Sequence, residues 1–283
     1  MTTTTFPTIP SATGPTSGGP ALAVRPPRRP AAALALEIAV MGSVFLAYRQ
    51  VRHLTSGDTD AAFANATRVV ALEQHLGLFS ERSVQRLVLH SETVVGFLNR
   101  YYVGVHFPAT ITVLLWACWR HPDAYRRIRT AFLGVTLGAL AIHVAVPLAP
   151  PRMLAGEGFV DTLRVYGPNI YPRDTTQSVA NQFAAMPSLH FGWAALLAIA
   201  VIMILRSPWR WLAVLHPAVT LLAIVATANH YWLDAIVAGL LIMGTAVAMR
   251  ARARRAPART ATTSVMTARA GAVADAEQFS SAA

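Results

Sequence analysis

The sequence predicts an all-α integral membrane protein, a polytopic helical bundle with about six transmembrane helices. Of its 283 residues, 54% are hydrophobic and only 13% are charged, whereas soluble domains have about 45–50% apolar and about 25% charged residues. The apolar residues gather into stretches of 18 or 19 residues between two polar ends. At about 1.5 Å per helical residue, each stretch nearly crosses a hydrocarbon core of about 30 Å. This pattern disfavours a soluble globular protein.

Two polar tails flank the predicted membrane domain. Residues 1–30 and 251–283 have compositions that cannot bury enough apolar surface to fold, and the second tail is also basic. We therefore interpret both as disordered cytoplasmic tails and 31–250 as the membrane-embedded domain. Segment 51–100 mixes apolar residues at helical spacing with charged ones, which predicts amphipathic helices at the membrane interface. The six predicted spans are 31–48, 101–119, 131–149, 187–205, 211–228 and 231–249.

The distribution of arginine predicts the orientation in the membrane. With six spans, both tails and the loops 120–130 and 206–210 share one side, which carries 15 of the 24 basic residues and three acidic ones. The other side carries nine basic and eight acidic residues, so the two net charges are +12 and +1. The positive-inside rule then predicts a multi-pass cell-membrane protein with both tails in the cytoplasm. Arginines placed this way indicate contact with anionic lipid, and nucleic acid is not an expected partner.

Three short motifs place polar side chains at the outer ends of predicted spans. Arg152 follows the third span, within APPR. Ser188 and His190 open the fourth span within MPSLH, and His230 and Asp234 open the sixth within NHYWLD. One span inward and one span back separate the two histidines, so both return to the same level. Asp234 is four residues after His230 and shares its helix face, where it can accept the Nδ1 proton and fix the tautomer.

Two imidazoles, a carboxylate and a guanidinium at one membrane level suit phosphoryl transfer. One imidazole attacks phosphorus, the other protonates the leaving oxygen, and the guanidinium holds the phosphate oxygens. Three other interpretations stay open. His230 and Asp234 could be a buried structural pair, two imidazoles with a carboxylate could bind a metal ion, and Arg152 could simply reach lipid phosphates.

Three further histidines lie inside the predicted spans. His106 and His143 are five or six residues from the outer boundary. Either could therefore line the site and support the residues that contact the substrate. His216 lies in the other half of its span, and we interpret it as a hydrogen-bonding group between helices.

The linked motifs resemble a known family. PSLH, followed about forty residues later by HYWLD and preceded by APPR, is similar to the type 2 phosphatidic acid phosphatase (PAP2) superfamily. The closer similarity is to its Aur1/Ipt1-type inositolphosphotransferase branch, which LEQHLG, segment 99–102 and His106 also resemble. The resemblance covers roughly residues 35–250 and implies a PAP2-like helical core.

The same resemblance implies a role for each matching residue. His230 is the nucleophile that becomes phosphohistidine, Asp234 orients it, and His190 is the general acid. Ser188 lies beside the phosphate. The implied mechanism requires neither a metal ion nor another cofactor.

Two departures from the superfamily pattern change the expected phosphate site. Leu189 stands where lipid phosphatases carry glycine, which favours the transferase-like branch. Ile224 stands where they carry arginine, six residues before the nucleophile, and the chain has no lysine. The phosphate is therefore expected to rest on Arg152, with Arg173 or Arg100.

The sequence thus predicts a membrane phosphotransferase or phosphatase that acts on a lipid-linked phosphate ester at the extracytoplasmic face. The substrate is a phospholipid or a polyprenyl or sphingoid lipid, and no obligate protein partner is evident. Transfer of an inositol-phosphate-like head group is favoured, and a lipid phosphate or pyrophosphate phosphatase that uses water is the alternative. A transporter or lipid-binding scaffold is the non-enzymatic alternative, and an intramembrane protease using Ser188 ranks last.

Overall fold

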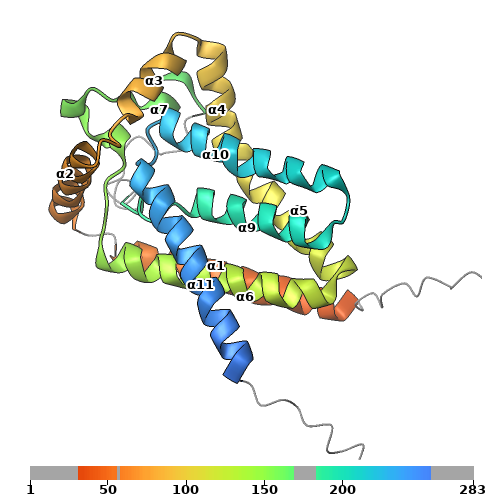
Figure 1. The fold of residues 1–283 in the computed structure, drawn as a ribbon. Helices are drawn as coiled ribbons and strands as arrows, with labels where there is room; N and C mark the ends of the chain where they lie inside the picture. Colours follow the sequence, from red (N-terminus) through yellow and green to blue (C-terminus); the bar gives the residue numbers. More distant parts are fainter. Residues whose placement is uncertain (1–30, 56–57, 169–182, 256–283) are drawn as a thin grey trace, which may run out of the picture.

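A computed structural model describes most of the predicted membrane domain. The described residues are 31–55, 58–168 and 183–255 (Figure 1). Within these ranges every regular element is a helix and no strand is formed, which confirms the all-helical fold class for this part of the chain. The predicted tails lie outside the described residues, apart from 251–255.

Helices α1, α5, α6, α9, α10 and α11 pack into a bundle (Figure 1). Helix α9 contacts α5, α6, α10 and α11, while α1 packs against α5 and α6. Helices α2, α3 and α7 lie at the end where α9 and α11 begin (Figure 1). The elements are α1 (Ala31–Thr55), α2 (Thr59–His75), α3 (Glu81–Leu89), α4 (Glu92–Gly104), α5 (His106–Arg120), α6 (Pro122–Ala145), η1 (Pro151–Met153), η2 (Ala155–Glu157), α7 (Thr162–Tyr166), α9 (Leu189–Ile204), η3 (Pro208–Val214), α10 (Leu215–Ala226) and α11 (Trp232–Arg255).

Several of these helices can cross a membrane by length and composition. Three segments qualify alone, namely α6, η3 together with α10, and α11. Helices α4 and α5 qualify as one span that is bent by 43°. Helix α9 is apolar but has only 16 residues. The described part of the chain therefore shows a membrane protein with three or four candidate spans, and the six predicted spans are not confirmed.

The bend between α4 and α5 differs from the expected straight span 101–119. Helix α4 begins nine residues upstream of that span's start, at Glu92, and the chain turns at Val105. Pro108 explains the break, because proline has no N–H to donate to the carbonyl of Gly104 and its ring crowds the preceding turn. Part of the segment expected at the interface thus belongs to a bent candidate span.

Two glycines let α11 pack closely against α6. A Cβ added at Gly134 would lie 2.6 Å from Cγ2 of Thr245, and one at Gly138 would lie 2.7 Å from Cδ1 of Leu241. The spacing G-x-x-x-G on one face is the arrangement that brings membrane helices into contact. Because α11 also carries Asp234, this contact fixes the helix on which one of the predicted site residues lies.

We expect Gly134→Val to lower the midpoint of thermal unfolding in detergent by about 3–10 °C, because overpacking of this kind costs about 1–3 kcal/mol. Thr245 is β-branched and has few rotamers, so its side chain cannot easily move away from the added valine. Gly244→Val is the matched control, since a Cβ at Gly244 on α11 meets nothing within 4 Å. Equal midpoints for the two variants would contradict close packing at Gly134.

Candidate active site

The PSLH motif forms the start of α9. Ser188 is the N-cap and is fully buried, and its side chain accepts an N–H of the first turn. The residue before it is held by His143, whose Nε2 lies 3.2 Å from the carbonyl oxygen of Pro187. A carbonyl only accepts, so Nε2 carries the proton and Nδ1 accepts from the hydroxyl of Tyr48 at 3.1 Å. His143 thus connects α1 and α6 to this motif.

The HYWLD motif places His230 against Asp234. Nδ1 of His230 lies 3.1 Å from Oδ2 of Asp234 and 2.8 Å from the carbonyl oxygen of Ala185. Since a carbonyl oxygen can only accept, Nδ1 carries the proton and the lone pair of the neutral ring is on Nε2. The expected shared helix face is wrong, because His230 precedes α11 and Asp234 reaches back from its first turn. Its Oδ2 also accepts from the amide of Tyr231 at 2.9 Å.

The fold brings the two motif histidines together. The ring centroids of His190 and His230 are 6.0 Å apart, with an angle of 56° between the ring planes. The amide of Ser188 donates to the carbonyl of Asp234 at 3.0 Å, so the starts of α9 and α11 are joined directly. The two imidazoles are therefore neighbours although forty positions separate them in the chain.

Aromatic side chains from α4 and α5 pack against His190. The Tyr102 ring stacks on it with centroids 4.3 Å apart, and the His106 ring lies at 4.5 Å. His106 is buried and contacts the site, as expected for a supporting group. His216 in α10 lies 2.7 Å from the hydroxyl of Tyr101 in α4, which is the expected kind of contact between helices.

Arg152 lies in η1 and is held on the turn that carries His230. Its amide donates to the carbonyl of Ala228 at 2.9 Å, and its Nη1 donates to Oδ1 of Asn229 at 2.7 Å. Its Nε lies 3.9 Å from Oδ2 of Asp161. The guanidinium is buried, which is costly for a charge and requires such partners. Asn229 immediately precedes His230, so the Arg152 side chain is bound to the residue next to that histidine.

The remaining predicted phosphate ligands are placed differently. Arg100 is exposed on α4, and none of the contacts described above involves it. Arg173 lies outside the described residues. Ile224 supports the turn through its backbone, because its carbonyl accepts the amides of Asn229 and His230. In the part of the chain that is described, no three His, Cys, Asp or Glu side chains cluster as metal ligands do.

Two glutamates that the sequence analysis did not single out hold the start of α11. Oε1 of Glu73 accepts from the amide of Leu233 at 2.8 Å, and Oε1 of Glu81 accepts from the amide of Trp232 at 3.0 Å. The first amides of a helix have no helical carbonyl to bind, so these carboxyl groups complete the helix end. Both side chains are fully buried. Their partners lie 160 and 151 positions away, so local spacing could not reveal them.

A comparison with protein-family models matches residues 67–249 to the PAP2 superfamily. The chain belongs to the PAP2 superfamily. Members of this superfamily are phosphatases, so membership suggests phosphatase or phosphotransferase activity. The matched region runs from α2 into α11 and contains all five motif residues, whereas α1 lies before it. Comparisons with curated proteins and with solved structures found no match.

Of the two glutamates of this PAP2 domain, Glu73 keeps its proton above the usual range of a carboxyl group. Burial, and then the hydrogen bond and charge of Glu81, raise the pKa of Glu73 from 4.5 to about 9, and the charge of Asp234 acts in the same direction. The amide of Leu233 opposes this change. Glu73 is therefore protonated at neutral pH in the folded protein.

This proton makes stability depend on pH. Between pH 4.5 and about 9 the folded protein keeps a proton that the unfolded chain releases, so the free energy of unfolding falls as pH rises across that window. We expect Glu73→Gln, which mimics the protonated acid, to gain stability relative to wild type as pH increases. Thermal unfolding in detergent at several pH values measures this. The exposed Glu92→Gln serves as control, and parallel curves for Glu73→Gln and wild type would contradict the raised pKa of Glu73.

Proposed function

We propose that this chain is a membrane phosphotransferase that forms a phosphohistidine on Nε2 of His230. The observation that supports it best is the pair of imidazoles 6.0 Å apart, one of which has its Nδ1 proton directed to Asp234 and to a backbone carbonyl. A ring held this way presents its lone pair on Nε2, as a nucleophile must. The second imidazole is close enough to serve the leaving oxygen.

The proposed reaction has two steps. Nε2 of His230 attacks phosphorus, the bond from phosphorus to the lipid oxygen breaks, and His190 gives its proton to that oxygen. The acceptor hydroxyl then attacks the phosphohistidine, and the now neutral His190 takes the acceptor's proton. Asp234 stabilises the positive charge that develops on His230, while Arg152 and Ser188 bind the phosphate oxygens.

The acceptor decides between transfer and hydrolysis. Tyr102 and His106 pack on His190, and we propose that this packing limits the access of water to the oxygen that His190 serves. Leu189 in place of glycine also favours the inositolphosphotransferase-like branch. We therefore propose transfer of an inositol-phosphate-like head group, and a lipid phosphatase is the second candidate. A new phosphodiester among the products indicates transfer, and free phosphate indicates hydrolysis.

The proposal includes a place in the membrane. Six spans with both tails in the cytoplasm would put the starts of α9 and α11 at the extracytoplasmic face of the cell membrane. A phospholipid or a polyprenyl or sphingoid lipid would then reach the site from the outer leaflet. The net charges of +12 and +1 on the two sides support this orientation. Accessibility of a cysteine placed in the loop 206–210 to an impermeant reagent in intact cells tests it.

We expect His230→Ala to abolish turnover and acid-labile phosphate on the protein, because no other group forms the covalent intermediate. His190→Ala should still form the phosphoprotein, because the nucleophile is present. Its formation and its turnover should both be slower, by about 10²–10⁴-fold, since His190 transfers a proton in each step. Purified protein with phosphatidylinositol and a long-chain alcohol, with phosphatidic acid, or with a pyrophosphate lipid provides the assay. His75→Ala, on α2, is the control. Unchanged turnover in both site variants would contradict the assignment.

We expect Arg152→Lys to weaken binding of phosphate about tenfold or more, because lysine keeps the charge but loses the planar fork that binds two oxygens. The inhibition constant of inorganic phosphate measures this without depending on the acceptor. Arg164→Lys, at an exposed position on α7, is the matched control. If both variants bind phosphate like wild type, Arg152 does not hold it.

A further inference from the structure

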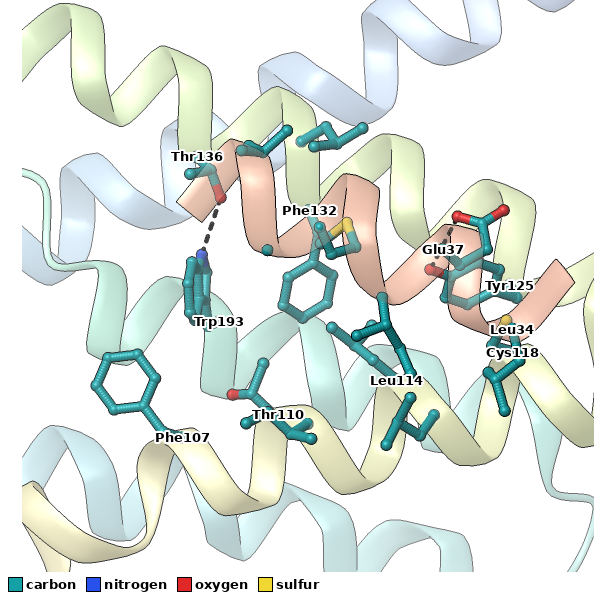
Figure 2. A pocket seen from close by; sticks show the side chains of 17 residues that line it. Leu34, Glu37, Phe107, Thr110, Leu114, Cys118, Tyr125, Phe132, Thr136 and Trp193 are labelled. Carbon is teal, nitrogen blue, oxygen red and sulfur yellow. Dashed lines mark hydrogen bonds between the residues drawn. The ribbon is translucent and has the colours of Figure 1, made fainter. Parts of the chain in front are cut away.

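An apolar cavity of about 330 Å³ lies between α1, α5, α6 and α9. Figure 2 shows Phe107 and Trp193 at one end and Glu37 and Tyr125 at the other, with Phe132 between them. At the first end, Nε1 of Trp193 donates a hydrogen bond to the hydroxyl oxygen of Thr136 at 3.1 Å. The space therefore offers hydrocarbon walls and few polar groups to a ligand, which suits an apolar chain.

The first end of this cavity adjoins the candidate site. Trp193 follows His190 by three positions, which is about one turn of α9. Its ring stacks on His106, with centroids 5.5 Å apart and 17° between the planes, and His106 lies 4.5 Å from His190. The cavity thus begins one ring away from the imidazole that serves the lipid oxygen in the proposed reaction.

The second end is polar. Oε1 of Glu37 lies 2.6 Å from Nη1 of Arg129, and the hydroxyl of Tyr125 lies 3.4 Å from Oε2 of the same glutamate. An apolar chain gains nothing by passing a charged pair, so this group marks where the cavity ends for such a ligand. It also gives Glu37, an acidic residue inside the first predicted span, a defined neighbour.

The length of the cavity matches one leaflet of a bilayer. On α5 its wall runs from Phe107 to Cys118, eleven residues that rise about 16 Å. Half of a hydrocarbon core of about 30 Å is about 15 Å. A single chain of a membrane lipid can therefore extend from the candidate site to the Glu37–Arg129 pair.

We propose that this cavity binds one hydrocarbon chain of the lipid alcohol whose oxygen His190 serves. The inference rests on the proposed function, because the leaving or accepting oxygen must lie at His190 and its chain must continue from there. Phe107 and Trp193 contact the first carbons, and the Glu37–Arg129 pair limits the chain length. The substrate class is then an ester of a long-chain lipid alcohol, and a short soluble alcohol is a poor partner.

Gly42 allows the cavity to be filled without disturbing the fold. It lines the cavity on α1, and a Cβ there meets nothing within 4 Å. Gly42→Phe should project into the space that the chain occupies. Gly244→Phe on α11 is the matched control, because it is equally open, faces outward and is not among the lining residues.

The binding test uses the hexadecyl ester of inositol phosphate with a diazirine on the last carbon of the chain. After illumination in nanodiscs, we expect adducts near Glu37 and Tyr125, reduced about tenfold by Gly42→Phe and unchanged by Gly244→Phe. Adducts on the outward faces of α10 and α11 that Gly42→Phe does not reduce would overturn the inference. The His230→Ala protein should show the same adducts, so this result does not depend on turnover.

A turnover test separates the inference from the proposed function. We expect Gly42→Phe to lower the ratio of kcat/KM for the hexadecyl over the butyl ester of inositol phosphate about tenfold, and Gly244→Phe to leave the ratio unchanged. An equal ratio in both variants overturns chain binding even where His230→Ala is inactive. Turnover that survives His230→Ala overturns the proposed reaction, while the adducts still decide where the chain lies.

Discussion

The arrangement of the site depends on how the first amides of α11 are satisfied in a membrane-embedded protein. An amide without a partner in a dry environment costs several kcal/mol. Carboxyl groups from α2, α3 and α11 itself accept these amides, through Glu73, Glu81 and Asp234. Because Asp234 is fixed by this network, the proton on Nδ1 of His230 is fixed as well. Helices α2 and α3 therefore help to hold the start of α11, and with it the carboxylate that accepts the Nδ1 proton of His230.

The same network explains why three acidic side chains can be buried together. Like charges so close cannot all be ionised, and the proton held by Glu73 removes one of them. The positive end of the α11 dipole stabilises the charge that stays.

The sequence predicted that the two histidine motifs lie together, but it did not predict the contacts of Glu73 and Glu81 that hold the second motif in place. Forty positions between His190 and His230 imply one span inward and one back, and the two rings do lie together. The break before Pro108 also had a local signal, although the predicted span ran through it. Glu73 and Glu81 had none, because a glutamate in an amphipathic helix is ordinarily solvated. Their function exists only in tertiary structure, where distant amides need acceptors.

The charge at the proposed phosphate site suits a phosphodiester better than a phosphomonoester. A phosphomonoester carries about 1.5 to 2 negative charges at neutral pH, whereas a diester carries one. Among the described residues, Arg152 is the cation that contacts the turn before α11, through Asn229. Oδ2 of Asp161, 3.9 Å from Nε of Arg152, offsets part of its positive charge. Ile224, where lipid phosphatases carry arginine, adds no second cation. In the proposed reaction, one partly neutralised guanidinium would balance one negative charge, which is the charge of a head group attached through a phosphodiester. This balance supports the proposed transfer over monoester hydrolysis.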